Sequence, residues 1–218
     1  YVETKMMQNM LNMNNIFVLP NFKKIIVLDE KDLIYNDNEP FKLCTFSRVM
    51  KEKGIEDAIN IVKTINCIAK RNIVMLDIYG QINASYLKEF EKIKKDFPEF
   101  ISYKGEVNFT KSTEVLKEYF LLLFPTFYDG EGFPGTIIDA FSSGLPVVAS
   151  NWKYNSEIIE HDKTGYLYKD MDEFKTIIQR LCANPMIVRN LKSNCIKKVK
   201  EYDSERLVKQ LLIDMNIK

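Results

Sequence analysis

The chain has 218 residues, of which 46% are hydrophobic and 28% charged, so it can bury one sizeable core. Its 31 Lys and Arg residues balance its 30 Asp and Glu residues, and the net charge of +1 argues against general attraction to nucleic acid or to anionic membranes. The apolar runs are short, so no membrane-spanning helix is expected.

The first 40 residues differ in pattern from the rest of the chain. They contain a helical segment rich in Met and Asn, an expected strand at residues 16–19, and a polar stretch at residues 36–40 that is typical of a linker. The chain begins at Tyr1, inside the expected helix, and we therefore interpret it as part of a longer protein.

From Phe41 onward, short apolar runs alternate with segments of helical periodicity. Strands are expected at residues 41–46, 73–79, 101–103, 120–124, 146–149 and 165–168. Helices are expected at residues 55–69, 87–93, 112–119, 154–160, 172–183, 186–202 and 204–215, and from Pro134. The run at residues 120–124 is apolar on both faces, as in a central parallel strand. This alternation predicts an α/β fold, a parallel sheet with helices on both faces.

Parallel sheets bind their ligands at the carboxyl ends of the strands. The loops that follow Phe46, Tyr79, Tyr103, Phe124 and Ala149 are therefore where a functional site is expected.

The loop after the first strand carries the first candidate group. Arg48 and Lys53 bracket the end of this strand and the start of the next helix, where they could hold a diphosphate together with free backbone N–H groups. Gly54 has no Cβ and would permit close approach of a ligand or of backbone. The alternative is a solvated basic loop.

The loop after residues 120–124 carries the second candidate group. Pro134 suits a first helical turn, which places Glu131 in the loop and Asp139 on the second turn of the helix. Gly132 and Gly135 would expose backbone N–H groups to an anion. The alternative is an acidic decoration of a helix N-terminus. A hydrolytic pair of carboxylates is a weaker interpretation, because their separation in space is unknown.

Other polar features favour structural roles. His161 is the single histidine and lies in a polar turn, where a surface position is expected, and no pattern of metal ligands is present in the sequence. Residues 192–200 are interpreted as a solvated charged helix face, and residues 144–151 as a turn that enters a strand. The cysteines lack CxxC spacing and predict free thiols in a reducing compartment; they are Cys44, Cys67, Cys182 and Cys195.

Taken together, these segments resemble the C-terminal half of a glycosyltransferase of the GT-B fold, in the large family four group. Ser47-Arg48 with Lys53-Gly54 is similar to the family's G-R-L-x-x-x-K-G segment, with Ser in place of the first Gly. Residues 124–140 are similar to its P-S-x-x-E-G-F-G-x-x-x-x-E-A signature. Further segments match in order at residues 78–80, 101–105, 144–150 and 164–167, and the resemblance covers roughly residues 41–215.

The resemblance implies the Rossmann-like half of a GT-B fold. It makes residues 1–40 the end of the N-terminal half with the interdomain linker, and residues 41–218 the nucleotide-sugar-binding domain. It also implies a retaining hexosyltransferase that moves a sugar from a UDP- or GDP-linked donor to a glycan or lipid-linked acceptor, a reaction of polysaccharide biosynthesis. A UDP-sugar epimerase of the same fold and a non-catalytic nucleotide-sugar-binding module are the alternatives.

The resemblance also implies roles for individual residues. Arg48 and Lys53 would hold the diphosphate and Glu131 would contact hydroxyls of the donor sugar, so these three are the predicted catalytic residues. Asp139 replaces the family's second Glu and would bond the ribose. The predicted donor-binding residues are Gly132, Phe133, Pro134, Gly135, Thr136, Asp139, Gly80, Gly105 and Val107. No metal or cofactor is expected, since Arg and Lys supply fixed positive charge for the phosphates.

The remaining expectations concern partners. The acceptor is expected to bind through the N-terminal half of the fold, which is also the half that would contact a membrane peripherally; no nucleic acid is expected. The location predicted is cytoplasmic, with the inner face of the membrane as an alternative. The chain alone is expected to bind donor weakly and to transfer little or nothing.

Overall fold

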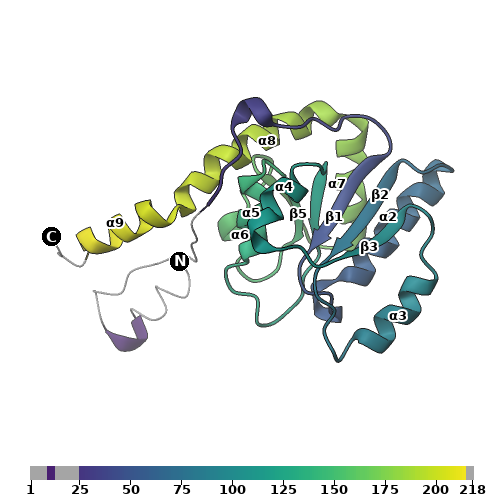
Figure 1. Cartoon of the computed structure of the whole chain (residues 1–218), viewed down its shortest axis with the longest axis horizontal. Coiled ribbons are helices and arrows are strands. Elements are labelled where there is room, and N and C mark those ends of the chain that lie inside the picture. The colour runs from purple at the N-terminus through teal and green to yellow at the C-terminus, as the bar shows by residue number, and fades with distance from the viewer. Residues whose placement is uncertain (1–8, 13–24, 215–218) are drawn as a thin grey trace.

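The computed structural model describes residues 9–12 and 25–214 (Figure 1). Residues 9–11 are helical. The rest of the expected N-terminal helix, the expected strand at residues 16–19 and the last residue expected in the C-terminal helix lie outside the described residues. The proposed domain boundary at residue 40 stays a prediction.

The described residues form a six-stranded parallel sheet with the strand order β3-β2-β1-β4-β5-β6. The strands are β1 (Phe41–Phe46), β2 (Val74–Tyr79), β3 (Ile101–Gly105), β4 (Leu121–Phe124), β5 (Val147–Ser150) and β6 (Gly165–Tyr168). β1 lies at the centre, where Leu43 pairs with Leu76 of β2 and with Leu121 of β4. The predicted α/β fold with a parallel sheet is confirmed, and each predicted strand is present within a few residues of its expected limits.

Helices cover both faces of the sheet (Figure 1). One face packs against α2 (Ile55–Ala69), α3 (Leu87–Lys95) and α7 (Met171–Ala183). The other packs against α4 (Ser112–Leu116) and α5 (Gly135–Ser142), and α8 (Pro185–Val199) contributes residues to both cores. The remaining helices are the short α6 (Asn155–Ile158) and α9 (Ser204–Asp214), which extends away from the sheet.

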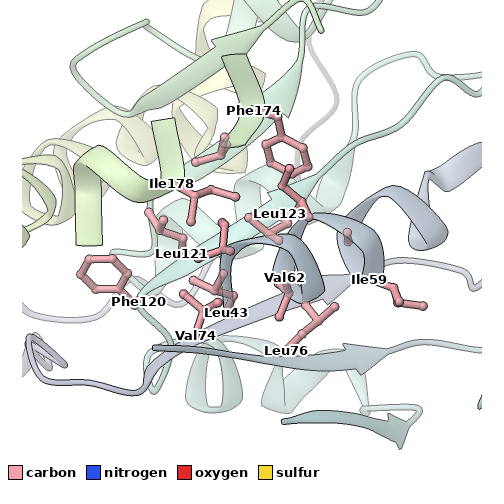
Figure 2. Close-up of a cluster of buried hydrophobic side chains, with 14 of the residues drawn as sticks. Leu43, Ile59, Val62, Val74, Leu76, Phe120, Leu121, Leu123, Phe174 and Ile178 are labelled. Carbon is pink, nitrogen blue, oxygen red and sulfur yellow. The ribbon is translucent and has the colours of Figure 1, made fainter. Parts of the chain in front are cut away.

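The larger core lies between the sheet and helices α2 and α7. Figure 2 shows Leu43, Leu76 and Leu121 of three neighbouring strands directed toward Val62 of α2 and Ile178 of α7. Alternate residues of β1 face opposite sides of the sheet, because strand side chains alternate, so the neighbouring Cys44 enters the second core. Full burial of each of these aliphatic side chains contributes about 1.5–3 kcal/mol. Two buried faces explain why the central strands are apolar throughout.

Two helices are shorter than predicted. α4 ends at Leu116 instead of continuing to residue 119, and soon afterwards the backbone N–H of Phe120 donates to the carbonyl of Lys42 in β1. α6 ends at Ile158, where Ile159 adopts an extended backbone with ψ 112°. Asp203 caps the last helix, since its carboxylate accepts from the backbone N–H groups of Glu205 and Arg206.

One interpretation of the charged helix α8 is wrong. Lys192 is 1% exposed, and its ammonium group donates to the carbonyl of Tyr119 at 3.0 Å. The other end of the predicted solvated face, Lys200, is exposed as expected. Burial lowers the pKa of Lys192 to about 8.

Residues 25–40 run along the body of the domain. The backbone N–H of Leu28 donates to the carbonyl of Ser142 in α5 at 2.9 Å, and the Asn36 amide donates to the carbonyl of Glu118. Asp37 forms an ion pair with Arg189 of α8. In the part of the chain that the structure describes, no helix has the length and apolar character needed to cross a membrane.

Candidate active site

The strand order places two loops side by side at the carboxyl edge of the sheet. β1 and β4 are neighbours although about 80 residues separate them in the chain, and the strand order reverses between them. The loop after β1 enters α2 on one face, and the loop after β4 enters α5 on the other. A crevice at such a reversal is where open parallel sheets bind ligands.

Gly54 brings these two loops into contact. Its backbone is left-handed, with φ 66°, and a Cβ atom at this position would lie 2.0 Å from the carbonyl oxygen of Pro125. Only glycine fits this approach without a shift of the backbone. The short 3-10 turn Lys51–Lys53 ends at this glycine, so Lys53 is fixed directly beside the loop after β4.

Lys53 and Glu131 form a buried ion pair. Their side chains are 9% and 8% exposed, and the Thr126 hydroxyl donates to the same Glu131 oxygen at 2.8 Å. The Lys53 ammonium group lies 5.1 Å from the centre of the Tyr128 ring, and the Arg48 guanidinium lies 5.9 Å from the same ring. The three predicted catalytic residues therefore converge around Tyr128.

The two cations of this site differ in their availability. The Lys53 charge is already compensated by Glu131. Arg48 is exposed and makes no ion pair with any other described residue. An anion at this edge of the sheet would thus meet one free guanidinium and one ammonium group that Glu131 holds in place.

A pocket of about 200 Å³ opens beside this group, at the ends of β1, β2 and β3. Its lining includes three predicted donor-binding residues, Gly80, Val107 and Thr136, and the ring of Tyr79. Gly80 permits a close approach of backbone, because a Cβ there would lie 1.8 Å from the carbonyl oxygen of Ser47. Gly105 does not line the pocket; its carbonyl accepts from the backbone N–H of Gly80 at 2.9 Å.

The structure ties Thr136 and Asp139 of α5 to different loops. The Thr136 hydroxyl donates to the carbonyl of Phe46 at the end of β1, at 2.8 Å. An Asp139 oxygen lies 3.1 Å from the Ser112 hydroxyl, which also donates to the carbonyl of Phe109. The Ser112 hydroxyl thus links Asp139 to the loop after β3. Asp139 therefore contacts Ser112 at the start of α4, whereas Glu131 contacts Thr126 and Lys53.

The predicted sugar-contacting segment lies between these networks. Gly132 and Gly135 are exposed, with no heavy atom within 4 Å of a Cβ built on either residue. The helix begins at Gly135, one residue later than predicted, because Pro134 has an extended backbone with ψ 112°. The Phe133 ring packs edge-on against Tyr202 at 5.2 Å. Donor-binding roles for these residues stay predictions.

A polar network that the sequence analysis missed supports the pocket. The hydroxyls of Tyr79 and Tyr119 lie 2.8 Å apart, and Tyr119 donates to the Asp77 carboxylate. Burial raises the pKa of both tyrosines, so they stay protonated donors. The sequence feature that could have indicated this network is Asp77, an acidic residue within an otherwise apolar strand. Within the described residues, no group of three or more His, Cys, Asp and Glu side chains could hold a metal; His161 is exposed, and all four cysteines are free thiols.

Curated relatives match a large part of this chain. A 26% identical stretch of 198 residues is shared with an uncharacterized glycosyltransferase of Methanocaldococcus jannaschii, covering 83% of this chain and 49% of the relative. The UDP-N-acetylglucosamine--peptide N-acetylglucosaminyltransferase GtfA subunit of Streptococcus agalactiae is 30% identical over 61% of this chain and 25% of its own length. The chain thus spans about half or less of these relatives.

Solved structures share the fold. S. aureus TarM, in a mutant complex with fondaparinux, α-GlcNAc-glycerol and UDP, superposes with a TM-score of 0.77 at 23% identity, over 99% of this chain and 42% of that one. The pneumococcal O-GlcNAc transferase GtfA in complex with UDP and GlcNAc gives a TM-score of 0.74 at 18% identity, over 96% of this chain and 42% of that one. The fold is that of the Rossmann-like domain of GT-B glycosyltransferases. The model of the family described as Glycosyl transferases group 1 matches residues 40–184, and the chain belongs to this family.

Proposed function

We propose that this domain binds a nucleotide-sugar donor, UDP- or GDP-linked, within a glycosyltransferase that retains the anomeric configuration. The observation that carries the proposal is the convergence of Arg48, Lys53 and Glu131 beside the pocket at the strand-order reversal. A diphosphate needs fixed positive charge, a sugar needs a carboxylate or another acceptor for its hydroxyls, and a base needs a pocket. This edge of the sheet offers all three within neighbouring loops.

The proposed roles of these residues follow from the negative charge that develops during sugar transfer. When the bond between the sugar C1 and the diphosphate breaks, negative charge grows on the departing phosphate oxygen. Arg48 stabilises that charge directly, and Lys53 contributes as far as its pairing with Glu131 allows. Glu131 accepts hydrogen bonds from sugar hydroxyls through whichever lone pairs Lys53 and Thr126 leave open. These fixed side-chain charges serve the diphosphate without a resident metal or cofactor.

The acceptor is proposed to be a glycan or a lipid-linked sugar. One relative is named alpha-galactosylglucosyldiacylglycerol synthase, from Streptococcus pneumoniae, and is 25% identical over 94% of this chain and 52% of its own length. In this proposal a second domain supplies much of the acceptor site and any peripheral contact with the inner face of the membrane, from the cytoplasmic side. UDP is the favoured nucleotide, because UDP appears in the names of the GtfA relatives and of the solved complexes.

Isothermal titration calorimetry with UDP and GDP tests the donor site. We expect saturable heat with UDP, and an affinity about tenfold lower in Arg48→Ala, because a charge-assisted contact to phosphate is lost. Lys51→Ala is the matched control, since Lys51 is an exposed cation of the same loop. A folded chain that gives no saturable heat with either nucleotide, or an Arg48→Ala variant that binds as the parent does, contradicts the proposal.

A further inference from the structure

A second, larger pocket of about 330 Å³ lies at the same edge of the sheet, beyond the loop after β4. It is framed by the start of α2, the ends of β5 and β6, and the start of α7. The nucleotide pocket described above shares none of its lining residues. Nothing in the proposed donor site uses this second pocket.

Aromatic side chains form part of its lining. The Phe127 ring is 43% exposed, Trp152 is half-buried, and Tyr168 is held flat against Phe174, with ring centres 4.2 Å apart. The Trp152 indole N–H is already used, because it donates to the carbonyl of Tyr128 at 3.0 Å. This hydrogen bond fixes the orientation of the ring, which also has the Lys153 ammonium group 5.6 Å from its centre and contributes apolar surface to the pocket.

Polar groups without partners accompany these rings. Asp57, on the first turn of α2, is half-buried, and its carboxylate makes no hydrogen bond or ion pair with any other described residue. Its burial raises the pKa of the carboxyl group, as expected for an acid that lacks compensation. The Asn151 side chain also makes no hydrogen bond with the described residues, although its backbone N–H donates to Tyr168. A carboxylate, an amide and aromatic faces together suit a ligand with both hydroxyls and C–H surfaces.

The charge of the pocket lining further restricts the class of ligand that could bind. The lining contains two aspartates, Asp57 and Asp170, and one cation, Lys169, so it carries net negative charge. Asp170 is occupied as the cap of α7, where it accepts from the backbone N–H of Glu173. A phosphate or a uronic acid would meet repulsion here, whereas a neutral sugar presents hydroxyl donors to Asp57 and C–H faces to the rings.

The pocket lies against the candidate active site. The segment Pro125–Thr126–Phe127 lines it, and the Thr126 hydroxyl of the same segment donates to Glu131 at 2.8 Å. Trp152 reaches Tyr128, whose ring lies over both Arg48 and Lys53. A ligand in this pocket would therefore contact the same segment that contacts the Lys53–Glu131 pair.

We propose that this pocket binds a neutral sugar unit of the glycan acceptor, so that the donor domain itself holds part of the acceptor chain. The inference rests on the proposed function for its biological role, but binding of a neutral sugar here is measurable independently of it. A seryl peptide is the rival occupant, and the experiment includes it.

The experiment uses Trp152 as a reporter, because it is the only tryptophan of the chain. The emission of the full 218-residue chain is followed during titration with neutral mono- and disaccharides, with glucuronate and with a serine-rich peptide, with and without saturating UDP. We expect a saturable change with a neutral sugar and none with glucuronate. Asp57→Asn should weaken sugar binding about tenfold, because a hydrogen bond to a charged group is lost, and should leave UDP affinity unchanged.

Asp172→Asn is the matched control, since this aspartate lies on the first turn of α7 with its side chain 91% exposed, and it should bind sugar as the parent does. The inference is overturned when no neutral sugar changes the emission, when Asp57→Asn and Asp172→Asn bind sugar equally, or when glucuronate or the peptide binds more tightly than every neutral sugar. UDP binding by calorimetry separates the two failures. If UDP does not bind, the proposed donor site is contradicted. If UDP binds but no neutral sugar changes the Trp152 emission, only the acceptor pocket is contradicted.

Discussion

Lys53 and Glu131 are nearly removed from water, and each satisfies the charge of the other. In such a pair the desolvation cost of both ions offsets much of their attraction, so the pair itself adds little stability. The consequence appears when one member is removed, because the remaining charge then stays buried without compensation. Because removing one residue costs much more than the intact pair contributes, substitutions of Lys53 and Glu131 test whether the two side chains are paired as described.

We expect Lys53→Met to lower the free energy of unfolding by about 3–5 kcal/mol, because it leaves the Glu131 carboxylate buried and unpaired. The double variant Lys53→Met/Glu131→Leu should recover most of that loss, since no buried charge remains. Urea unfolding of the parent, the two single variants and the double variant measures the coupling. Losses in the two single variants that simply add in the double variant would show that the residues do not form the pair.

Lys192 is the second buried charge, and its pKa of about 8 links stability to pH. In the unfolded chain this lysine has its ordinary pKa of about 10.4. Between these two values the unfolded state binds more protons than the folded state, so the contribution of Lys192 to stability rises with pH. Its cost is therefore fully present below about pH 8 and absent above about pH 10.4.

The variant Lys192→Met should consequently gain stability relative to the parent at neutral pH, and this advantage should shrink by about 3 kcal/mol as the pH rises from about 8 to about 10.4. Urea unfolding of both proteins across this range gives the difference directly. Lys197→Met, on the exposed side of the same helix, is the control. A difference between Lys192→Met and the parent that stays constant with pH contradicts the assigned burial of a charged lysine.

At the scale of elements, periodicity predicted most of the sheet and the long helices, because the two cores impose their pattern on the sequence. α2 illustrates this, since its buried residues recur at the predicted positions from Ile55 to Ile65. The short helices α4 and α6 were predicted too long. The chain after α4 bonds instead to β1, which lies far away in the sequence, and the chain after α6 turns extended at Ile159. Lys192 was misread for the same reason: its acceptor, the Tyr119 carbonyl, lies 73 residues away.

Only part of the candidate site could be predicted from the sequence. The loop motifs identified Arg48, Lys53 and Glu131, but their meeting required β1 and β4 to be neighbours, which no local pattern states. For the pocket around Trp152, the sequence marked only the loops after Phe124 and Ala149, because its walls also come from the starts of α2 and α7. Sequence patterns indicate which loops contain functional side chains, and the strand order determines which of these loops lie next to one another.

The contact between the loops after β1 and β4 depends on Gly54, and this gives a prediction at the element scale. Gly54→Ala should lower the free energy of unfolding by more than about 2 kcal/mol, since alanine is strained at φ 66° and its Cβ would meet the Pro125 carbonyl at 2.0 Å. Gly135→Ala is the matched control, because that site is open and alanine favours the first turn of α5. Equal stability of the two variants in urea would mean that the loops do not approach as described.

At the scale of the whole molecule, residues 25–40 attach to the domain through hydrogen bonds, ion pairs and packing. The ion pair between Asp37 and Arg189 and the packing of Leu33 are two of these contacts, and substitution can compare them. Leu33 is 8% exposed and packs over Gly144, where an added Cβ would lie 2.3 Å from its Cδ2 atom. The ion pair is partly open to solvent, with the Arg189 side chain 44% exposed.

These magnitudes predict that packing, and not charge, holds the segment in place. Leu33→Ala should cost about 2–5 kcal/mol of unfolding free energy, because a buried cavity is left between the segment and α5. Arg189→Ala should cost less than about 1 kcal/mol, since exposed ion pairs are screened by water and salt. Urea unfolding ranks the two variants, and hydrogen exchange at the Leu28 amide, which donates to Ser142, reports whether the segment has detached. Faster exchange in Arg189→Ala than in Leu33→Ala would reverse the ranking and make the ion pair the main attachment of residues 25–40 to the domain.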